Sequence, residues 1–407
     1  MIGSRAVRGF VYVCMTAVGC DAGPAPITEF AERDSAGVRI VENAAPRASG
    51  AAAWVFDSVP VLDIGLAPDG VSPVLHNVSA AVRLADGRIV IANDTSPVLR
   101  WFDPDGRFLF GTGRVGDAAG EFSGHLLRIH PMWVLPGDSV ATWQHSIRQM
   151  QVFGPDGEFA RSLRIAPLQG MTWPTMVGRF ETTGFATWSE PDVPTLEPDR
   201  QQYGMRRFAR FAPDGSYAGQ ILDARGLLLY GSTYLDRPVN GRVPFSPVPA
   251  AATSGDRFYF GAADAWEFRA FDPHGALRAI VRRADPPRLL TDSMRSAHAR
   301  EQMASAPADP SLRTEWRRVV DGYPYPDRYP AYRAMRVDPS GNLWIESFAV
   351  PGDTTVTWSI FDAQGIWRSE ITLPRDVDVL DIGENSILVL ARIGDVHHVR
   401  LHRLRRH

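Results

Sequence analysis

The sequence contains no lysine, since all of its 43 basic residues are arginines. Lysine supplies the amine of Schiff-base catalysis and the phosphate-binding side chain of P-loop nucleotide sites, so both kinds of site are excluded. Two catalytic motifs are also missing from the sequence: the HExxH spacing of zinc hydrolases and the GxSxG turn that carries a nucleophilic serine. No local motif therefore identifies the chain as an enzyme.

Cysteine is almost absent, because only Cys14 and Cys20 occur. Cys14 lies in a segment that we expect to be removed, which leaves Cys20 alone. No disulfide can then form within the chain, and cysteine catalysis and thiolate metal sites are excluded as well. Burial of apolar side chains and pairing of strands must hold the fold together.

Charge is also nearly balanced, with a net charge of -3. A basic run occurs only at the end of the chain, at Arg403, Arg405 and Arg406. Nucleic-acid binding is not expected without a larger basic surface.

Long hydrophobic runs are absent too. Arg5 and Arg8 precede one short apolar run, residues 10–18, which is too short to span a bilayer and indicates a signal segment. It ends at Ala17-Val18-Gly19-Cys20, which resembles the lipobox of bacterial lipoproteins, although Leu is usual where Ala17 stands.

The resemblance implies a signal peptide over residues 1–19 and acyl chains on Cys20 that anchor the protein in a membrane. The protein would then lie in the cell envelope on the extracytoplasmic side, at the periplasmic side or the outer membrane. An ordinary cleaved signal is the alternative. Residues 20–53 are rich in Ala, Gly and Pro and are interpreted as a tether.

Five similar phrases organise the rest of the chain. They are Phe102-Asp103-Pro104-Asp105-Gly106 and the related segments 153–157, 211–215, 271–275 and 361–365. Proline presets the first turn position and glycine accepts the left-handed position that ends a turn, so each phrase predicts a β-hairpin corner. Alternating apolar runs flank each corner, as expected for strands. Their recurrence about every 50 to 60 residues predicts a radial array of small sheets.

We therefore expect an all-β fold over residues 54–407: a six-bladed β-propeller with four-stranded antiparallel blades. The last set of strands, from Val377 onward, has only three members. A closed ring leaves no unpaired edge, so a strand from the amino-terminal part should complete it. Residues 59–64 are the first choice for this closing strand and residues 38–42 the second.

A helical insertion is predicted at residues 288–322, between blades 4 and 5. Thr291 is a candidate cap for a helix that ends near Ser305, and Asp309 followed by Pro310 starts a second helix. The apolar stripe of this second helix either packs on blade edges or lets the insertion cover the central opening as a lid.

Part of the sequence resembles NHL-type propellers. The pattern GxxGxxxGEF, from Gly113 to Phe122, follows the first corner and is similar to their inter-blade linkers. The last two sets of strands look like those of bacterial six-bladed propeller lipoproteins related to that group. The resemblance covers residues 35–407 and implies the fold. It leaves the function open, because such families contain scaffolds, lyases and lactonases.

In a propeller the second strand of every blade ends on the face that carries the inter-blade loops. The side chains just past those ends should surround the mouth of the central channel and form the candidate ligand-binding site. They are Asp94, Trp143, His145, Trp188, Glu190, Asp264, Trp266, Glu346 and Arg392. Indole rings suit sugars, peptides or aromatic ligands.

Two functions are compatible with this set of residues, and a purely structural role in the cell envelope is a third alternative. The first is a non-enzymatic propeller that binds a protein, peptide or carbohydrate on its loop face. The second is a metal-dependent hydrolase or lyase of the lactonase or amidating-lyase type. The resemblance to NHL-type enzymes implies a calcium or zinc ion for it, with Asp94, His145 and Glu190 as candidate ligands. A three-histidine site would need His76, His125 or His130 instead.

Overall fold

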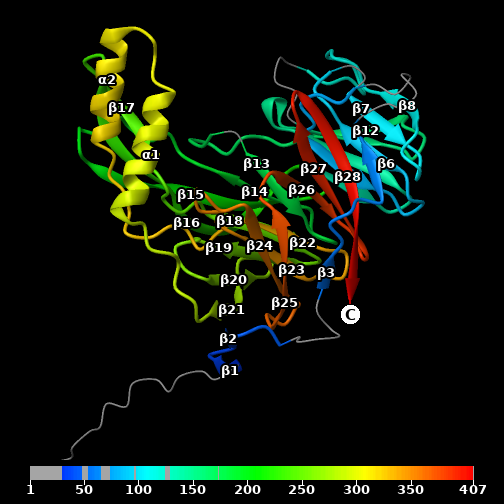
Figure 1. Cartoon of the computed structure of the whole chain (residues 1–407). Helices are drawn as coiled ribbons and strands as arrows, with labels where there is room; N and C mark the ends of the chain where they lie inside the picture. The colour runs from blue at the N-terminus through cyan, green and yellow to red at the C-terminus, as the bar shows by residue number, and fades with distance from the viewer. Residues whose placement is uncertain are drawn as a thin grey trace, which may run out of the picture.

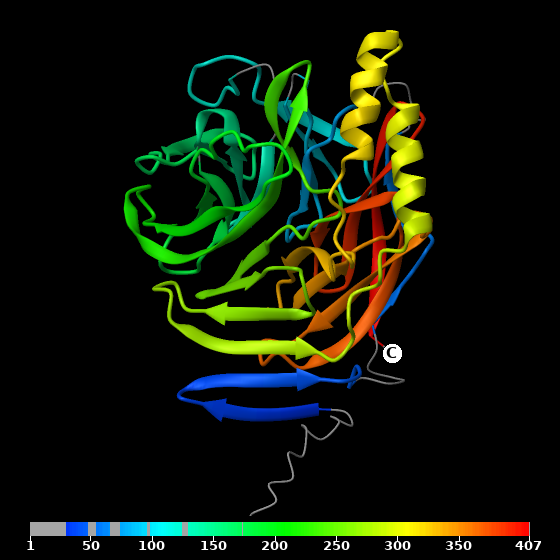
Figure 2. The same ribbon diagram turned by 90° about the vertical axis from the view of Figure 1, so that its left-hand side faces the viewer.

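The computed structural model describes residues 30–47, 54–65, 74–95, 98–123, 129–172 and 174–406. They form six β-sheets, which follow one another along the chain around a ring (Figures 1 and 2). The fold is therefore the predicted six-bladed β-propeller. The expected signal peptide, Cys20 and His125 lie outside the described residues.

In blades 1 to 5 the repeated strands are antiparallel neighbours in sequence order, and blade 6 has three such strands completed from the amino-terminal part. Blade 1 consists of β5 (Ala80–Arg83), β6 (Ile89–Ala92), β7 (Leu99–Phe102) and β8 (Phe108–Thr112). Blade 2 consists of β9 (Ile129–Leu135), β10 (Ser139–Gln144), β11 (Gln149–Phe153) and β12 (Phe159–Arg164), with a 3-10 helix at His145–Ile147. Blade 3 consists of β13 (Thr175–Arg179), β14 (Phe185–Ser189), β15 (Gln201–Phe211), β16 (Tyr217–Tyr234) and a fifth strand, β17 (Arg237–Arg242).

The second half of the ring repeats this plan. Blade 4 consists of β18 (Ala250–Ser254), β19 (Arg257–Gly261), β20 (Glu267–Phe271) and β21 (Leu277–Arg283). Blade 5 consists of β22 (Tyr332–Val337), β23 (Leu343–Ser347), β24 (Thr355–Phe361) and β25 (Trp367–Pro374). Blade 6 consists of β26 (Val377–Ile382), β27 (Ser386–Ile393) and β28 (Val396–Arg406), completed by β3 (Trp54–Phe56) and β4 (Leu62–Ile64).

The five repeated phrases are the corners between the third and fourth strands of blades 1 to 5. In the first, Asp103 Oδ1 accepts hydrogen bonds from the backbone N–H groups of Asp105 (3.0 Å) and Arg107 (2.8 Å). The glycine that ends each phrase has a φ between 80° and 88°. A β-bulge follows at every corner. The predicted turn chemistry is confirmed, because only glycine adopts this left-handed position without a steric cost.

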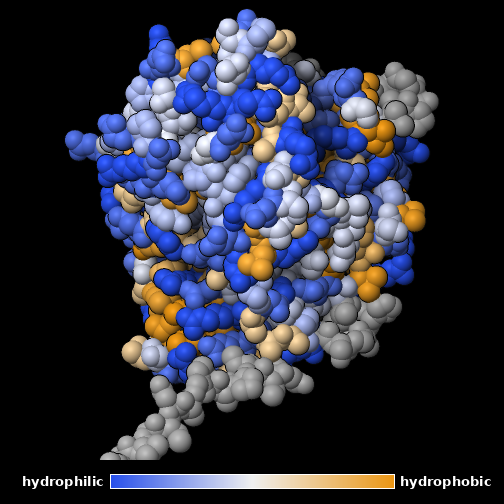
Figure 3. All heavy atoms as spheres, turned by 60° about the vertical axis from the view of Figure 1, so that its left-hand side comes forward, coloured by the Kyte–Doolittle hydropathy of each residue, from blue (hydrophilic) through white to orange (hydrophobic). Residues whose placement is uncertain are grey.

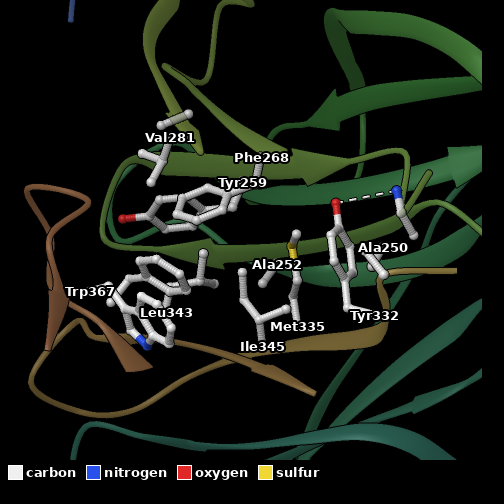
Figure 4. Packing of buried hydrophobic residues seen from close by; sticks show 14 of the residues in the cluster. Ala250, Ala252, Tyr259, Phe268, Val281, Tyr332, Met335, Leu343, Ile345 and Trp367 are labelled. Carbon is white, nitrogen blue, oxygen red and sulfur yellow. Dashed lines mark hydrogen bonds between the residues drawn. The ribbon is translucent and has the colours of Figure 1, made fainter. Parts of the chain in front are cut away.

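The hydrophobic core lies between the blades rather than at the centre of the ring. Six clusters of buried side chains each join two consecutive blades, and one of them joins blade 6 to blade 1. Figure 4 shows Tyr259 and Phe268 of blade 4 facing Leu343, Ile345 and Trp367 of blade 5. The surface seen in Figure 3 is mainly hydrophilic. An unbroken series of interfaces is what closes the ring.

An amino-terminal strand completes blade 6, as predicted. β4 pairs with β28 in antiparallel register, with Ile64 opposite Val399 and Leu62 opposite Leu401. β3 pairs with the end of the same strand (Figure 1). The first choice of closing segment, residues 59–64, is therefore confirmed.

The second choice, residues 38–42, is wrong as a closing strand. This segment lies in β2 (Val38–Asn43), which forms a hairpin with β1 (Phe30–Ser35) and adds to blade 4 parallel to β21 (Figure 2). The expected tether, residues 20–53, thus contains a docked hairpin. The side chain of Asn43, which is 1% exposed, fixes it by hydrogen bonds with Gly365 O (3.1 Å) and the N–H of Trp367 (3.0 Å).

Two helices form the predicted insertion, α1 (Asp292–Ala304) and α2 (Pro310–Asp321). The carboxylate of Asp309 accepts hydrogen bonds from the N–H groups of Ser311 and Leu312, so it caps α2 as expected. Arg318 of α2 donates to Thr233 O of β16 at 2.6 Å, and the helices stand beside β17 in Figure 1. The insertion packs against an extension of blade 3. Whether it also acts as a lid stays a prediction.

No helix in the described part of the chain has the length and apolar character needed to cross a membrane.

Candidate functional site

The mouth is the end of the central channel on the face that carries the inter-blade connections. In each blade, the first strand follows an inter-blade connection, so it starts at this face and runs away from it. The antiparallel second strand then returns and ends at this face. β14 and β23 bring Trp188, Glu190 and Glu346 to this end. The antiparallel order of the blades therefore gathers these polar side chains at one face, as the sequence indicated.

Three residues form a packed polar unit at the mouth of blade 3. Arg206 of β15 donates from Nε (2.8 Å) and Nη2 (2.6 Å) to Oε1 of Glu190. Its guanidinium lies 3.8 Å from the centre of the Trp188 ring. The Arg206 side chain is 6% exposed and that of Glu190 is 26% exposed. A buried cation held by a carboxylate and an indole gives this unit a fixed shape.

The unit borders a cavity of about 560 Å³. His145, from the 3-10 helix of blade 2, also lines it, together with Thr172 and Asp192. Thr172 is joined to Glu190 twice: its hydroxyl accepts from the Glu190 N–H at 3.0 Å, and its own N–H donates to Glu190 O at 2.6 Å. We call this space the mouth cavity. It brings together His145, Trp188 and Glu190, three of the predicted site residues.

Two other predicted residues belong to a chain of charges between blades 5 and 6. Arg333 donates to Glu346 at 2.5 Å and lies 3.7 Å from Asp378. Asp378 also pairs with Arg392 at 2.8 Å. Burial raises the pKa of Glu346 above its ordinary value, and the neighbouring Arg333 opposes this shift. Glu346 and Arg392 are thus held in an ion-pair network with the first strands of these blades.

The remaining predicted acids are also engaged. Asp264 forms an exposed ion pair with Arg225 at 2.9 Å. Asp94 accepts from the amide of Asn77 at 2.7 Å, beside the junction of blades 6 and 1. Neither acid lines the mouth cavity.

Trp143 does not reach the mouth, so its inclusion in the site is wrong. It is fully buried in the interface of blades 2 and 3, packed with Met150, Met176 and Phe185. Trp143 lies inside β10, and its side chain points to the face that blade 3 covers. Trp266 is partly exposed but contacts Arg283 and Tyr332, away from the mouth cavity.

The metal-site candidates do not form one cluster. His145 and Glu190 line the mouth cavity, whereas Asp94 pairs with Asn77. In the described residues, no group of three or more His, Cys, Asp or Glu side chains could hold a metal ion. A calcium or zinc ion stays a prediction from the resemblance.

The histidines considered for a three-histidine site have separate environments. The ring of His76 contacts Asp395 O at 3.2 Å. His130 is on a first strand and is exposed, but the surrounding protein atoms displace water around it and, with the nearby Arg336, lower its pKa to about 4. His130 is therefore neutral at pH 7.

Sequence reasoning missed the arginines. Arg206, Arg333 and Arg336 fix or face the acids of the mouth and channel, yet they are on first or third strands rather than at second-strand ends. The only available signal was the alternation of strand residues, which points Arg206 and Arg207 to opposite faces. Alternation does not show which of the two faces is covered.

No protein-family model matches this chain, and no curated protein matches it. Solved structures do resemble it. A protein of Bacteroides fragilis, provisionally named as exported, is 8% identical, with a TM-score of 0.46 over 90% of this chain and 99% of that one. A DUF4221-family member of Bacteroides vulgatus is 9% identical, with a TM-score of 0.47 over 88% and 100%.

A gluconolactonase of Xanthomonas campestris is 14% identical, with a TM-score of 0.39 over 88% of this chain and 99% of that one. At these levels the likenesses concern the fold alone.

Proposed function

We propose that this protein is a lipid-anchored, extracytoplasmic β-propeller that binds a polar ligand in the mouth cavity. The ligand is a peptide, a carbohydrate or a segment of a partner protein. The observation that carries the proposal is the fixed unit of Trp188, Arg206 and Glu190, because it gives the cavity a wall that exists before any ligand binds. A preformed polar wall lowers the entropy that binding costs.

Binding fits the acids better than catalysis does. A general acid or base needs a carboxyl group within reach of the substrate and a pKa suited to proton transfer. Glu190, Asp264 and Glu346 are instead paired with Arg206, Arg225 and Arg333 at 2.9 Å or less. An arginine that already binds these carboxylate oxygens would compete with a metal ion for them.

Ligand binding in the mouth cavity can be tested by replacing exposed residues of its rim, whose side chains do not hold the fold together. We expect the double variant His145→Ala, Asp192→Ala to bind a ligand of the protein about tenfold more weakly, because two polar contacts are lost. The ligand is first selected from panels of short peptides and oligosaccharides by thermal shift. Isothermal titration calorimetry on wild-type and variant protein then gives the dissociation constants.

Asp264→Ala is the matched control, since it removes an exposed acid outside the mouth cavity. It should bind within about twofold of wild type. Equal affinity of the double variant and wild type, or the absence of any ligand in both panels, would contradict the proposal.

The anchor rests on the sequence around Cys20, outside the described residues. In a bacterial host, the wild-type protein should sediment with membranes and yield an acylated amino-terminal peptide by mass spectrometry. Cys20→Ser should remove the acyl mass and most membrane association, because no second lipid signal is evident. Cys14→Ser, within the expected signal peptide, should behave like wild type. An acylated Cys20→Ser protein would disprove the anchor.

A further inference from the structure

A second cavity, of about 620 Å³, lies between blades 4 and 5. We call it the interblade cavity. Its walls come from the ends of β21 and β23, from β24 and β25, and from the two stems of the helical insertion. It shares no lining residue with the mouth cavity. The structure therefore separates Trp266, which lines the interblade cavity, from the mouth residues with which the sequence grouped it.

The charged groups in its wall compensate one another. Arg283 pairs with Glu370 at 3.1 Å, and Arg288 donates to both carboxylate oxygens of Asp353 at 3.0 Å. Two cations facing two anions give the wall no net charge. The arginines and carboxylates of the wall already pair with one another, so neither is free to pair with a charged ligand. An uncharged ligand therefore fits best.

The wall nevertheless offers many hydrogen-bonding groups. Hydroxyl-bearing side chains line it at Ser347, Thr354, Thr355 and Thr357. The partly exposed indole of Trp266 also lines the cavity, with the guanidinium of Arg283 over one part of the ring. Hydroxyl groups next to an aromatic ring match a ligand with hydroxyls around an apolar ring, which is the chemistry of a sugar.

Tyr329 gives a second, independent indication of a ligand. It lines the cavity and is 2% exposed, yet its hydroxyl has no hydrogen-bond partner in the described structure. The ring itself is fixed, since it packs against Phe245 and Phe348 at 5.0 and 5.6 Å between ring centres. A buried hydroxyl without a partner is costly, and a ligand hydroxyl can satisfy it.

We propose that the interblade cavity binds a neutral, polyhydroxylated ligand of the size of a mono- or disaccharide. Its volume lies within the usual range of about 300 to 1,000 Å³ for small-molecule sites. This site is additional to the mouth cavity, and its proposal does not depend on the proposed function.

The ligand would also contact the root of the helical insertion. The two stems of the insertion are paired, with the N–H of Tyr329 donating to Arg288 O and that of Leu290 donating to Asp327 O, both at 2.9 Å. Arg288 and Tyr329 are in the cavity wall. A bound sugar should therefore reduce amide hydrogen exchange at residues 286–290 and 327–331, because it restrains both stems.

The test uses Tyr329→Phe, which removes only the unpartnered oxygen. Glucose, galactose, mannose, N-acetylglucosamine and maltose are titrated by calorimetry into the mature protein. We expect at least one to bind below about 10 mM and the variant to bind it about fivefold more weakly, with no loss of thermal stability. Tyr217→Phe, at an exposed tyrosine of blade 3, should bind like wild type.

A second experiment tests whether the site takes a free sugar or part of a longer glycan. In it, a soluble polysaccharide replaces the free sugars. Binding of the polysaccharide alone would show that the site takes a segment of a longer glycan. The variant His145→Ala, Asp192→Ala should keep its sugar binding. The proposal is overturned if no neutral sugar or polysaccharide binds, if Tyr329→Phe binds as tightly as wild type, or if only the mouth variant loses binding.

Discussion

Replacing Arg283 by alanine is expected to lower the free energy of unfolding by about 4 kcal/mol, because a cation whose side chain is only 10% exposed is lost together with its packing. The guanidinium lies between two indole rings, 4.1 Å from the centre of Trp266 and 3.7 Å from that of Trp367. It also donates to Ser359 Oγ at 2.6 Å and to Glu370 at 3.1 Å. The change leaves a void between blades 4 and 5 and removes the cation that pairs with Glu370. Urea unfolding followed by circular dichroism measures the loss.

The neighbouring residue is a matched control. Arg282 points to the opposite face of β21, is 38% exposed, and pairs with Glu267 at 2.8 Å. Arg282→Ala should cost less than about 1 kcal/mol, because solvent screens an exposed pair. Arg283→Lys should be intermediate, since it keeps the charge but loses the flat guanidinium that stacks on the rings. Equal losses at positions 282 and 283 would show that burial between the tryptophans does not matter.

The repeat made most of the fold predictable. Each corner is a local event, in which one glycine and one turn-forming phrase specify the bend, and the bend sets the register of the flanking strands. The cap at Asp309 is equally local. Closure was predictable for a different reason: three strands in the last blade leave one edge open, and residues 59–64 are an alternating segment near the start.

The docked hairpin was not predictable as such. Residues 38–42 are apolar enough to pair with the open edge of a sheet. Both β21 and β28 offer such an edge, so the sequence allowed two places for this segment. Asn43 decides the outcome, because its buried amide fits between Arg282, Gly365 and Trp367. These partners lie about 240 to 320 residues away in sequence, so no local pattern shows them.

The candidate site was predictable in position but not in detail. Trp143 and Trp188 stand in nearly identical contexts, Ala-Thr-Trp-Gln-His and Ala-Thr-Trp-Ser-Glu. One is fully buried by blade 3, whereas the other stacks on Arg206 and lines the mouth cavity. The difference arises from the neighbouring blade. The same holds for the interblade cavity, whose walls combine four strands with the stems of the insertion.

The closing strand β4 makes a charged contact that should contribute measurably to the stability of the propeller. Asp63 of β4 contacts two residues of β28: its Oδ1 lies 2.7 Å from Nδ1 of His398, and its Oδ2 accepts from Nε of Arg400 at 2.7 Å. The side chain of His398 is 2% exposed, whereas that of Asp63 is 34% exposed. Beside this contact, Ile64 is buried in the interface of blades 6 and 1.

Asp63→Ala is therefore expected to lower the free energy of unfolding by about 2 kcal/mol, a value between those of buried and exposed pairs. It should also speed amide exchange in β4 and β28, because the ring opens where its two ends meet. Urea unfolding and hydrogen exchange give the two readouts. Asp223→Ala is the control: its fork with Arg207, at 2.7 and 2.8 Å, lies within one hairpin and closes no ring. If both variants lose the same stability, the contact has no special role in closure; a larger loss and faster exchange at Asp63 alone would show that the side chain holds the two ends of the propeller together.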